Sequence, residues 1–220
     1  MPIEAATEAV RLPFADRVAA GRMLARRLAQ FRGQNPVVLG IPRGGVPVAR
    51  EVALAIAGQL DIVVARKLGA PFSPELALGA VTADGGRFLN QDLVRDLEVT
   101  PEYLEQVTAA QLEEASQRES RFRAGAAGPN LRDRIVILVD DGLATGATMR
   151  AAIQAVRAAH PRRVVVAVPV GSSDACQAIA GEVDELICLT TPDPFHSVGA
   201  HYERFEAVPD AQVETILRER

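Results

Sequence analysis

The chain has 220 residues, of which 48% are hydrophobic, and it carries a formal net charge of −4 at pH 7. This length and composition are sufficient for one domain with a buried core. The acidic balance argues against a nucleic-acid-binding surface. No apolar run reaches the length of a transmembrane helix, and the first eleven residues lack the apolar core of a signal peptide. We therefore expect a cytoplasmic protein, folded as a single domain over residues 1–220, that binds neither nucleic acid nor a membrane.

Short apolar strands and helices alternate in the first part of the chain. Asp16 is expected to cap a helix over residues 17–31, whose arginine-bearing face we expect to be solvated. Strands are expected at Val37–Ile41 and Asp61–Ala65, with an amphipathic helix between them. The order strand, helix, strand is typical of a parallel sheet with right-handed connections. The sequence therefore predicts an α/β fold.

Cationic and glycine residues follow both of these strands. Arg43, Gly44 and Gly45 come directly after the first strand, and a guanidinium beside exposed backbone amides is suited to bind a diphosphate. Arg66 and Lys67 are expected at the end of the second strand. By themselves these residues are weak evidence for a diphosphate site, because an ordinary glycine turn and an ordinary charged strand end have the same sequence pattern.

A segment from about residue 70 to residue 130 is expected to be an insertion in this pattern. Leu78–Leu89 contains a D-G-G turn between apolar runs and predicts a β-hairpin. A helix is expected from Pro101 to about Arg121, and its charged face indicates contact with solvent or with a partner.

The most informative stretch covers residues 135–148. Ile135–Val139 is apolar on both faces, as expected of a buried parallel strand, and a helix is expected to begin near Met149. Asp140 and Asp141 are then at the carboxyl end of the strand. In an open α/β sheet, this is the edge where ligands bind.

The loop between the acidic pair and this helix has the composition of a phosphate site. Gly142 and Gly146 let backbone amides approach an anion, and the helix start adds a favourable dipole. Thr145 adds a hydroxyl donor. The two carboxylates would repel a phosphate and suit instead the vicinal hydroxyls of a sugar, or a divalent ion carried by the ligand. The stretch therefore predicts a ribose phosphate ligand; the alternative is a strand-to-helix turn with an incidental acidic pair.

Spacing excludes two common phosphate loops, because no Lys follows Gly146 as in a Walker loop and no G-x-G-x-x-G precedes the helix. The stretch resembles instead the motif with which type I phosphoribosyltransferases bind 5-phosphoribosyl 1-diphosphate (PRPP), a hydrophobic run followed by two acidic residues and a T-G-x-T loop. The D-R-x-x-A-G-x-x-L-A start at Asp16 and the I-P-R-G-G loop at Ile41 extend the resemblance over nearly the whole chain. They resemble a group of bacterial proteins described only as candidate phosphoribosyltransferases.

This resemblance implies an α/β fold of the type I phosphoribosyltransferase kind, with a parallel sheet flanked by helices. The core is expected over about residues 35–190, with an insertion or flap at about 70–130. A small hood is expected from the termini, at about residues 1–32 and 190–220. The remaining elements are expected at Arg163–Val168, Ser173–Ala180, Val183–Leu189 and Pro209–Arg220.

The resemblance also implies a role for each candidate site residue. Asp140 and Asp141 are the expected catalytic residues, which orient the ribose hydroxyls and offset positive charge. The loop residues expected to hold the 5-phosphate are Gly142, Leu143, Ala144, Thr145, Gly146, Ala147 and Thr148. The residues expected to bind pyrophosphate are Arg43, Gly44, Gly45, Arg66 and Lys67. No residue is expected to bind a metal directly, because Mg²⁺ is carried by PRPP.

The implied reaction is transfer of ribose 5-phosphate to a nitrogen acceptor, usually a nucleobase, with release of pyrophosphate. The resemblance also implies a homodimer. Ala144 stands where 6-oxopurine enzymes carry an acidic residue, whereas the tail after residue 190 resembles the segment with which those enzymes read their base. The base is therefore left open. Phe195 is the candidate for stacking on it, and packing of the last loop is the alternative role.

Two other functions are compatible with the same pattern. The first is a sensor that binds PRPP without turnover and reports it to a partner. The second is hydrolysis of a ribose phosphate or an ester. The chain has no G-x-S-x-G or H-E-x-x-H motif, which argues against an esterase.

Overall fold

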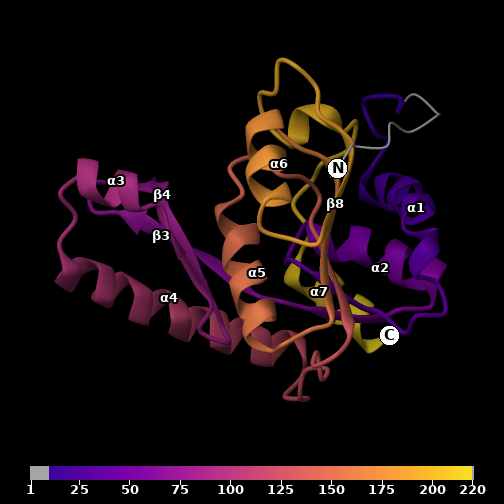
Figure 1. Ribbon diagram of the computed structural model, residues 1–220, viewed down its shortest axis with the longest axis horizontal. Coiled ribbons are helices and arrows are strands. Elements are labelled where there is room, and N and C mark those ends of the chain that lie inside the picture. The colour runs from indigo at the N-terminus through magenta and orange to yellow at the C-terminus, as the bar shows by residue number, and fades with distance from the viewer. Residues whose placement is uncertain (1–9, 220) are drawn as a thin grey trace.

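A five-stranded parallel sheet forms the centre of the molecule (Figure 1). The computed structural model describes residues 10–219, apart from the side chain of Glu75, so residues 1–9 of the predicted hood lie outside the described part. The strand order is β2-β1-β6-β7-β8, and paired strands run parallel. The strands are β1 (Val37–Gly40), β2 (Gln59–Ile62), β6 (Ile135–Val139), β7 (Arg163–Val170) and β8 (Glu185–Thr190). The predicted α/β fold is confirmed.

Helices cover both faces of this sheet because its inner strands are apolar on both sides. All five residues of β6 are buried, with Ile137 packed into the cluster on one face and Leu138 into the cluster on the other. One face is covered by α1 (Arg17–Arg27), α2 (Gly45–Ile56) and α7 (Asp210–Arg218), and the other by α5 (Ala147–Ala158) and α6 (Ser173–Ala180).

The helix termini follow local signals in the sequence. Asp16 Oδ1 accepts a hydrogen bond from Ala19 N at 2.8 Å, which confirms the predicted cap of α1. The helix ends at Arg27, and a 3₁₀ turn at Ala29–Phe31 completes the segment predicted as one helix. The main contacts of α7 are with α2 and α4.

The predicted mid-chain insertion forms an arm that projects from the central sheet (Figure 1). Its antiparallel sheet contains β3 (Ala65–Ala70), β4 (Ser73–Thr82) and β5 (Arg87–Leu89), and its helices are α3 (Gln91–Asp96) and α4 (Pro101–Phe122). The hairpin with the D-G-G turn is confirmed as β4 and β5. Thr100 caps α4 by accepting a hydrogen bond from Tyr103 N, and the Tyr103 hydroxyl donates to the carbonyl of Gly69 at 3.0 Å, which fixes α4 on the arm sheet.

One strand boundary differs from the prediction. The strand expected at Asp61–Ala65 ends at Ile62 as β2, and a new strand, β3, begins at Ala65 in the other sheet. Arg66 and Lys67 are therefore inside β3 and not at a strand exit. The apolar run through Val64 is continuous, and a change of pairing partner leaves no mark in such a run.

The base of the arm rests on α5. A Cβ at Gly86, in the D-G-G turn, would lie 2.6 Å from both the backbone nitrogen and the Cβ of Ala155. The guanidinium of Arg150 lies 4.7 Å from the ring centroid of Phe88 on β5.

None of the helices within residues 10–219 is both long and apolar enough to cross a membrane.

Candidate active site

The acidic pair lies directly beside the loop that follows β1. A Cβ at Gly44 would lie 2.6 Å from the carboxylate carbon of Asp141. A Cβ at Gly45 would lie 2.6 Å from the backbone oxygen of Val139 and 2.8 Å from the Cα of Asp140. Only glycine allows this approach of the two loops, which the parallel pairing of β1 with β6 brings to one edge. The structure thus joins two of the segments selected from the sequence.

Both carboxylates are in a region with little access to water. Burial raises the pKa of Asp140 well above its usual range, and the adjacent Asp141 raises it further. Burial also raises the pKa of Asp141, against the hydrogen bond from Arg17, which lowers it. Asp140 Oδ1 accepts a hydrogen bond from the backbone nitrogen of Asp141 at 2.8 Å. Ionisation of both groups therefore has a cost, which a bound donor or cation would reduce.

Arg17 is a site residue that the sequence analysis missed. Its Nε lies 2.7 Å from Asp141 Oδ2, and the two side chains are only 11% and 14% exposed. The expectation that this face of the first helix is solvated is therefore wrong for Arg17. A salt bridge across 124 residues leaves no local pattern; the only signal was the position of Arg17 in the D-R-x-x-A-G start.

Residues 198–206 cover the acidic pair from the side of the chain terminus. The Tyr202 hydroxyl donates a hydrogen bond to the carbonyl of Asp141 at 2.6 Å, and burial raises the pKa of Tyr202, so the hydroxyl keeps its proton. The guanidinium of Arg17 lies 3.8 Å from the ring centroid of Phe205 and donates to the carbonyl of Glu206 at 2.9 Å. These contacts join the start of α1 to the predicted C-terminal hood.

The loop from Gly142 to Thr148 is anchored at one end and open at the other. Leu143 is buried, and its backbone nitrogen donates to Val170 O at 2.9 Å. Ser172 Oγ donates to the carbonyl of Ala144 at 2.7 Å, whereas the side chains of Ala144 and Thr145 are exposed. Gly146 has a φ of 79°, and α5 begins at Ala147, two residues before the predicted start. The first amides of α5 are therefore available to an anion.

The side chain of Arg43 contacts the start of α7. Its Nη1 lies 3.5 Å from Asp210 Oδ1 at the start of α7, and its side chain is 42% exposed. The neighbouring Gly44 contacts Asp141, so the loop spans from the acidic pair to α7.

Arg66 and Lys67 lie in β3, in the antiparallel sheet of the arm. Arg66 Nε donates to Gln111 Oε1 at 3.1 Å, and its guanidinium forms an ion pair with Glu114. Lys67 is exposed, and successive residues of a strand point to opposite faces. The structure thus directs Arg66 to α4, and the two cations do not form one surface.

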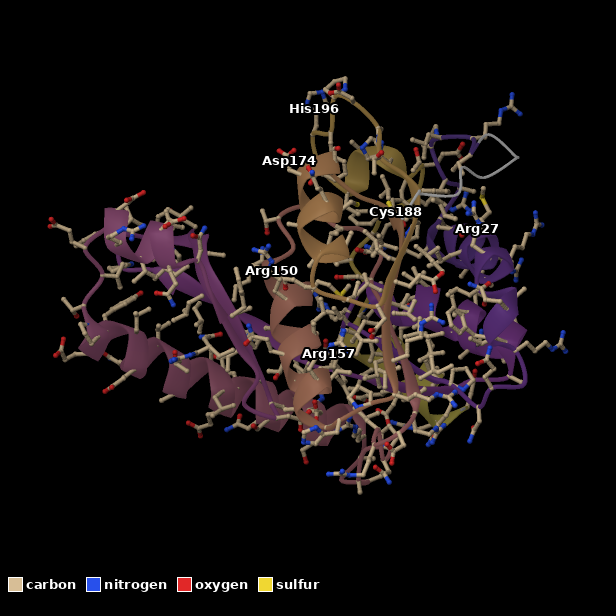
Figure 2. All side chains as sticks on the ribbon, in the orientation of Figure 1. Arg27, Arg150, Arg157, Asp174, Cys188 and His196 are labelled. Carbon is tan, nitrogen blue, oxygen red and sulfur yellow. The ribbon has the colours of Figure 1, made fainter. Side chains whose placement is uncertain are left out.

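Phe195 is half-buried in the segment that follows β8. Its ring centroid lies 5.3 Å from that of His201, and it packs against the cluster that contains Phe14 and Tyr202. This contact matches the alternative of an aromatic residue that packs the last loop, and base stacking stays a prediction. His196 is exposed at the outer end of this loop (Figure 2).

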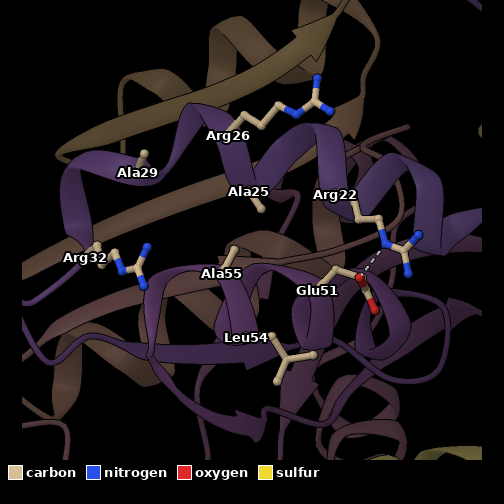
Figure 3. A pocket seen from close by; sticks show the side chains of 8 residues that line it. All are labelled: Arg22, Ala25, Arg26, Ala29, Arg32, Glu51, Leu54 and Ala55. Atoms are coloured by element: carbon tan, nitrogen blue, oxygen red, sulfur yellow. Dashed lines mark hydrogen bonds and ion pairs between the residues drawn. The ribbon is translucent and has the colours of Figure 1, made fainter.

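A hollow of about 400 Å³ lies elsewhere, between α1 and α2 (Figure 3). Figure 3 shows the ion pair of Arg22 with Glu51 at one end and Arg32 at the other, with Leu54 and alanines between them. None of its lining residues is among the candidate catalytic, phosphate-binding, pyrophosphate-binding or base-binding residues, so we assign it no part in the site.

Known proteins are similar to this chain over most of its length. The family described as Phosphoribosyl transferase domain matches residues 17–202, which include the acidic pair, both loops and Tyr202. Two proteins of Mycobacterium tuberculosis, named "Putative phosphoribosyl transferase Rv0571c" and "Putative phosphoribosyl transferase MT0597", are each 49% identical over 204 residues. The match covers 93% of this chain and 46% of each relative, so the chain spans about half the length of these curated relatives.

Solved structures share the fold. The crystal structure of TT1426 from Thermus thermophilus is 45% identical, with a TM-score of 0.81 over 94% of this chain and 99% of that one. A hypoxanthine phosphoribosyltransferase from Staphylococcus aureus has a TM-score of 0.50 and 12% identity, over 86% of this chain and 79% of that one. At that identity the likeness concerns the fold alone.

Proposed function

Since the chain belongs to the phosphoribosyl transferase domain family, we propose that it binds PRPP and transfers ribose 5-phosphate to a nitrogen acceptor, with release of pyrophosphate. One observation carries this proposal, the contact of Gly44 with Asp141. It supports the proposal because a glycine-rich loop that could bind a diphosphate lies against carboxylates that could bind ribose hydroxyls, at the same sheet edge as the candidate phosphate loop. These three subsites match the three parts of PRPP.

Each part of the substrate has its own partners in this proposal. The ribose hydroxyls donate to Asp140 and Asp141, which also offset the positive charge that develops on the sugar ring as the diphosphate leaves. The 5-phosphate accepts hydrogen bonds from the amides and hydroxyls of residues 142–148. The diphosphate binds the backbone of Gly44 and Gly45 and the guanidinium of Arg43, with Lys67 as the second cation predicted from the sequence. Catalysis is then mainly positioning and electrostatic stabilisation.

In this proposal a divalent ion enters the site together with the substrate. Residues 10–219 contain no group of three or more His, Cys, Asp or Glu that could hold a metal. Mg²⁺ is commonly bound through phosphates, water and one or two carboxylates, and such an ion would neutralise charge on the diphosphate. We therefore include Mg²⁺ as a companion of PRPP.

The acceptor in this proposal is a nucleobase, which is held against residues 198–206. Arg17, Tyr202 and Phe205 close this side and exclude water from the sugar carbon. Whether Phe195 stacks on the base depends on whether its ring leaves His201. A homodimer in the cytoplasm completes the proposal, to be checked by light scattering and by cell fractionation.

A PRPP sensor without turnover is the second candidate, and the Arg17–Asp141 salt bridge favours it. This bridge occupies a carboxylate that the ribose hydroxyls need during the reaction. A sensor would bind PRPP at the outer subsites and leave the bridge intact.

Calorimetric titration with PRPP and Mg²⁺, followed by a pyrophosphate-release assay with the common nucleobases, separates these functions. A transferase binds PRPP and releases pyrophosphate with one base, whereas a sensor binds PRPP and releases none. The double variant Asp140→Asn, Asp141→Asn should lose PRPP affinity. Asp96→Asn, which removes one exposed carboxylate from α3, is the matched control. Equal PRPP affinity in the double variant and the control would contradict the ribose assignment.

A further inference from the structure

Three arginines from two separate elements converge on one carboxylate beside the candidate active site. Asp210 Oδ1 lies 2.8 Å from Arg118 Nη2 and 3.5 Å from Arg43 Nη1. Asp210 Oδ2 lies 3.3 Å from Arg121 Nη1. Arg118 and Arg121 belong to α4, the helix of the arm, whereas Arg43 belongs to the loop that contacts the acidic pair. We call Arg43, Arg118 and Arg121 the guanidinium cluster.

The ion pairs found around the guanidinium cluster within residues 10–219 contain more guanidinium groups than carboxylates. Arg121 Nε also lies 2.9 Å from Glu214 Oε1, and Glu214 is shared with Arg218 at 3.4 Å. These contacts join four guanidinium groups to two carboxylates, so positive charge is in excess. The Nε of Arg118 is buried and has no hydrogen-bond partner in the described part of the chain. The cluster therefore has both charge and a donor to spare for an anion.

The carboxylate in the guanidinium cluster is accessible. The side chain of Asp210 is 25% exposed, and those of Arg43 and Arg121 are 42% and 60% exposed. The hydrogen bond from Arg118, with the charges of Arg118, Arg121 and Arg43, lowers the pKa of Asp210. Asp210 is thus an anion held by three cations at the surface, where a phosphate group can replace it.

One face of α4 carries charged residues that contact both the arm sheet and Asp210. Glu114, Arg118 and Arg121 follow each other at about one helical turn and share a face of α4. Glu114 takes the guanidinium of Arg66, so the cation predicted for the diphosphate is already paired. The next turns of the same face supply the arginines that reach Asp210.

We propose that Arg118 and Arg121 bind the diphosphate of the substrate together with Arg43, and that Asp210 occupies the guanidinium cluster as an internal anion in the free protein. This inference rests on the proposed function, because it names further residues of the same diphosphate site. Guanidinium groups bind phosphate oxygens through paired, charge-assisted hydrogen bonds, which suits a ligand with several terminal oxygens. Binding of the diphosphate then brings the arm helix into contact with the substrate.

Calorimetric titration with inorganic pyrophosphate and Mg²⁺ tests the assignment. Arg118→Ala and Arg121→Ala should each weaken pyrophosphate binding by about fivefold or more, as expected for loss of a charged contact. Arg95→Ala, which removes an exposed arginine from α3 of the same arm, should leave the affinity unchanged. Asp210→Asn should strengthen pyrophosphate binding by about threefold or more, because the competing charge is gone.

The sign of the Asp210→Asn effect separates this inference from a scaffold role. If Asp210 only positioned Arg43, Asp210→Asn would weaken pyrophosphate binding as Arg43→Ala does, and the inference would be overturned. Poor folding of the variant cannot imitate tighter binding. Unchanged affinity in both α4 variants, with PRPP binding and pyrophosphate release intact in the wild type, would refute the inference alone. A wild-type protein that binds neither PRPP nor pyrophosphate would refute the proposed function with it.

Discussion

Arg17 Nε lies 2.7 Å from Asp141 Oδ2 and links the first turn of α1 to the acidic pair 124 residues later. The pKa values of both aspartates are raised by burial, and Arg17 is the cation that opposes this effect. The hydrogen bond from Arg17 to the carbonyl of Glu206 extends the link to the C-terminal segment. Ionisation of the acidic pair therefore depends on a residue that closes the site.

Arg17→Gln should restrict PRPP binding to higher pH. Without the guanidinium the pKa of Asp141 rises further, so the carboxylate takes up a proton earlier as the pH falls. When PRPP affinity is measured from about pH 5 to about pH 8, its fall towards acid pH should begin at a higher pH than in the wild type. Arg17→Lys should restore part of the range. Arg22→Gln, which removes an exposed arginine of the same helix, is the control, and identical pH profiles for all variants would contradict the electrostatic role.

Asp140→Asn should stabilise the protein at neutral pH and abolish PRPP binding. The folded-state pKa of Asp140 is raised, so the folded protein favours the protonated group. Ionisation of Asp140 therefore destabilises the folded protein. This loss of stability is absent below the pKa of the group in the unfolded chain and is complete once the pH exceeds its pKa in the folded protein. The gain in Tm, about 2–4 °C for each kcal/mol in a chain of this size, should therefore shrink as the pH falls. A gain that grew towards acid pH would have the wrong sign.

Gly44→Ala should impair binding without loss of the fold. The new Cβ would collide with the carboxylate of Asp141, which then has to leave Arg17. We expect PRPP affinity to fall by about tenfold or more, corresponding to about 1.4 kcal/mol. Gly181→Ala is the matched control, because its Cβ would meet only Ala178 O at 3.6 Å. Equal PRPP affinities for Gly44→Ala and Gly181→Ala would show that the close approach of Gly44 to Asp141 does not matter for binding.

Ser172→Ala should loosen the phosphate loop. Its hydroxyl donates to Ala144 O and accepts from Ala175 N at 3.2 Å, so one side chain anchors the loop and caps α6. Loss of the cap should cost about 1 kcal/mol of unfolding free energy in urea. Ribose 5-phosphate should also bind more weakly. Ser173→Ala, at the next position, serves as control; a stability loss with unchanged ribose 5-phosphate affinity would limit Ser172 to capping.

The elements that the sequence predicts well depend on local signals. The bounds of β6 at Ile135–Val139 and of α6 at Ser173–Ala180 agree with the prediction, because a doubly buried strand and a serine-capped helix are defined by adjacent residues. The positions of the T-G-x-T loop after β6 and of the Arg43–Gly45 loop after β1 were predicted for the same reason. Parallel pairing of β1 with β6 then brings them together without further information.

The parts that the sequence does not predict depend on distant pairs. Arg17 with Asp141, and Arg118 with Asp210, are ordinary surface charges until the fold brings them together. The change from β2 to β3 within one apolar run was missed because hydrophobicity does not report a strand's partner. Most helices and strands can therefore be predicted from the sequence. The charged contacts around the candidate site cannot, because they form only when the fold brings distant residues together.

The close approach of Gly86 to Ala155 has a mechanical consequence for the arm. Ala155 belongs to α5, whose first turn completes the candidate phosphate loop, so one helix both supports the base of the arm and forms the end of that loop. A rotation of the whole arm about its base would have to move α5 as well and would disturb the candidate phosphate loop. Any bending that accompanies substrate capture therefore has to arise farther out, between α3 and the middle of α4, where the arm is clear of the central sheet (Figure 1).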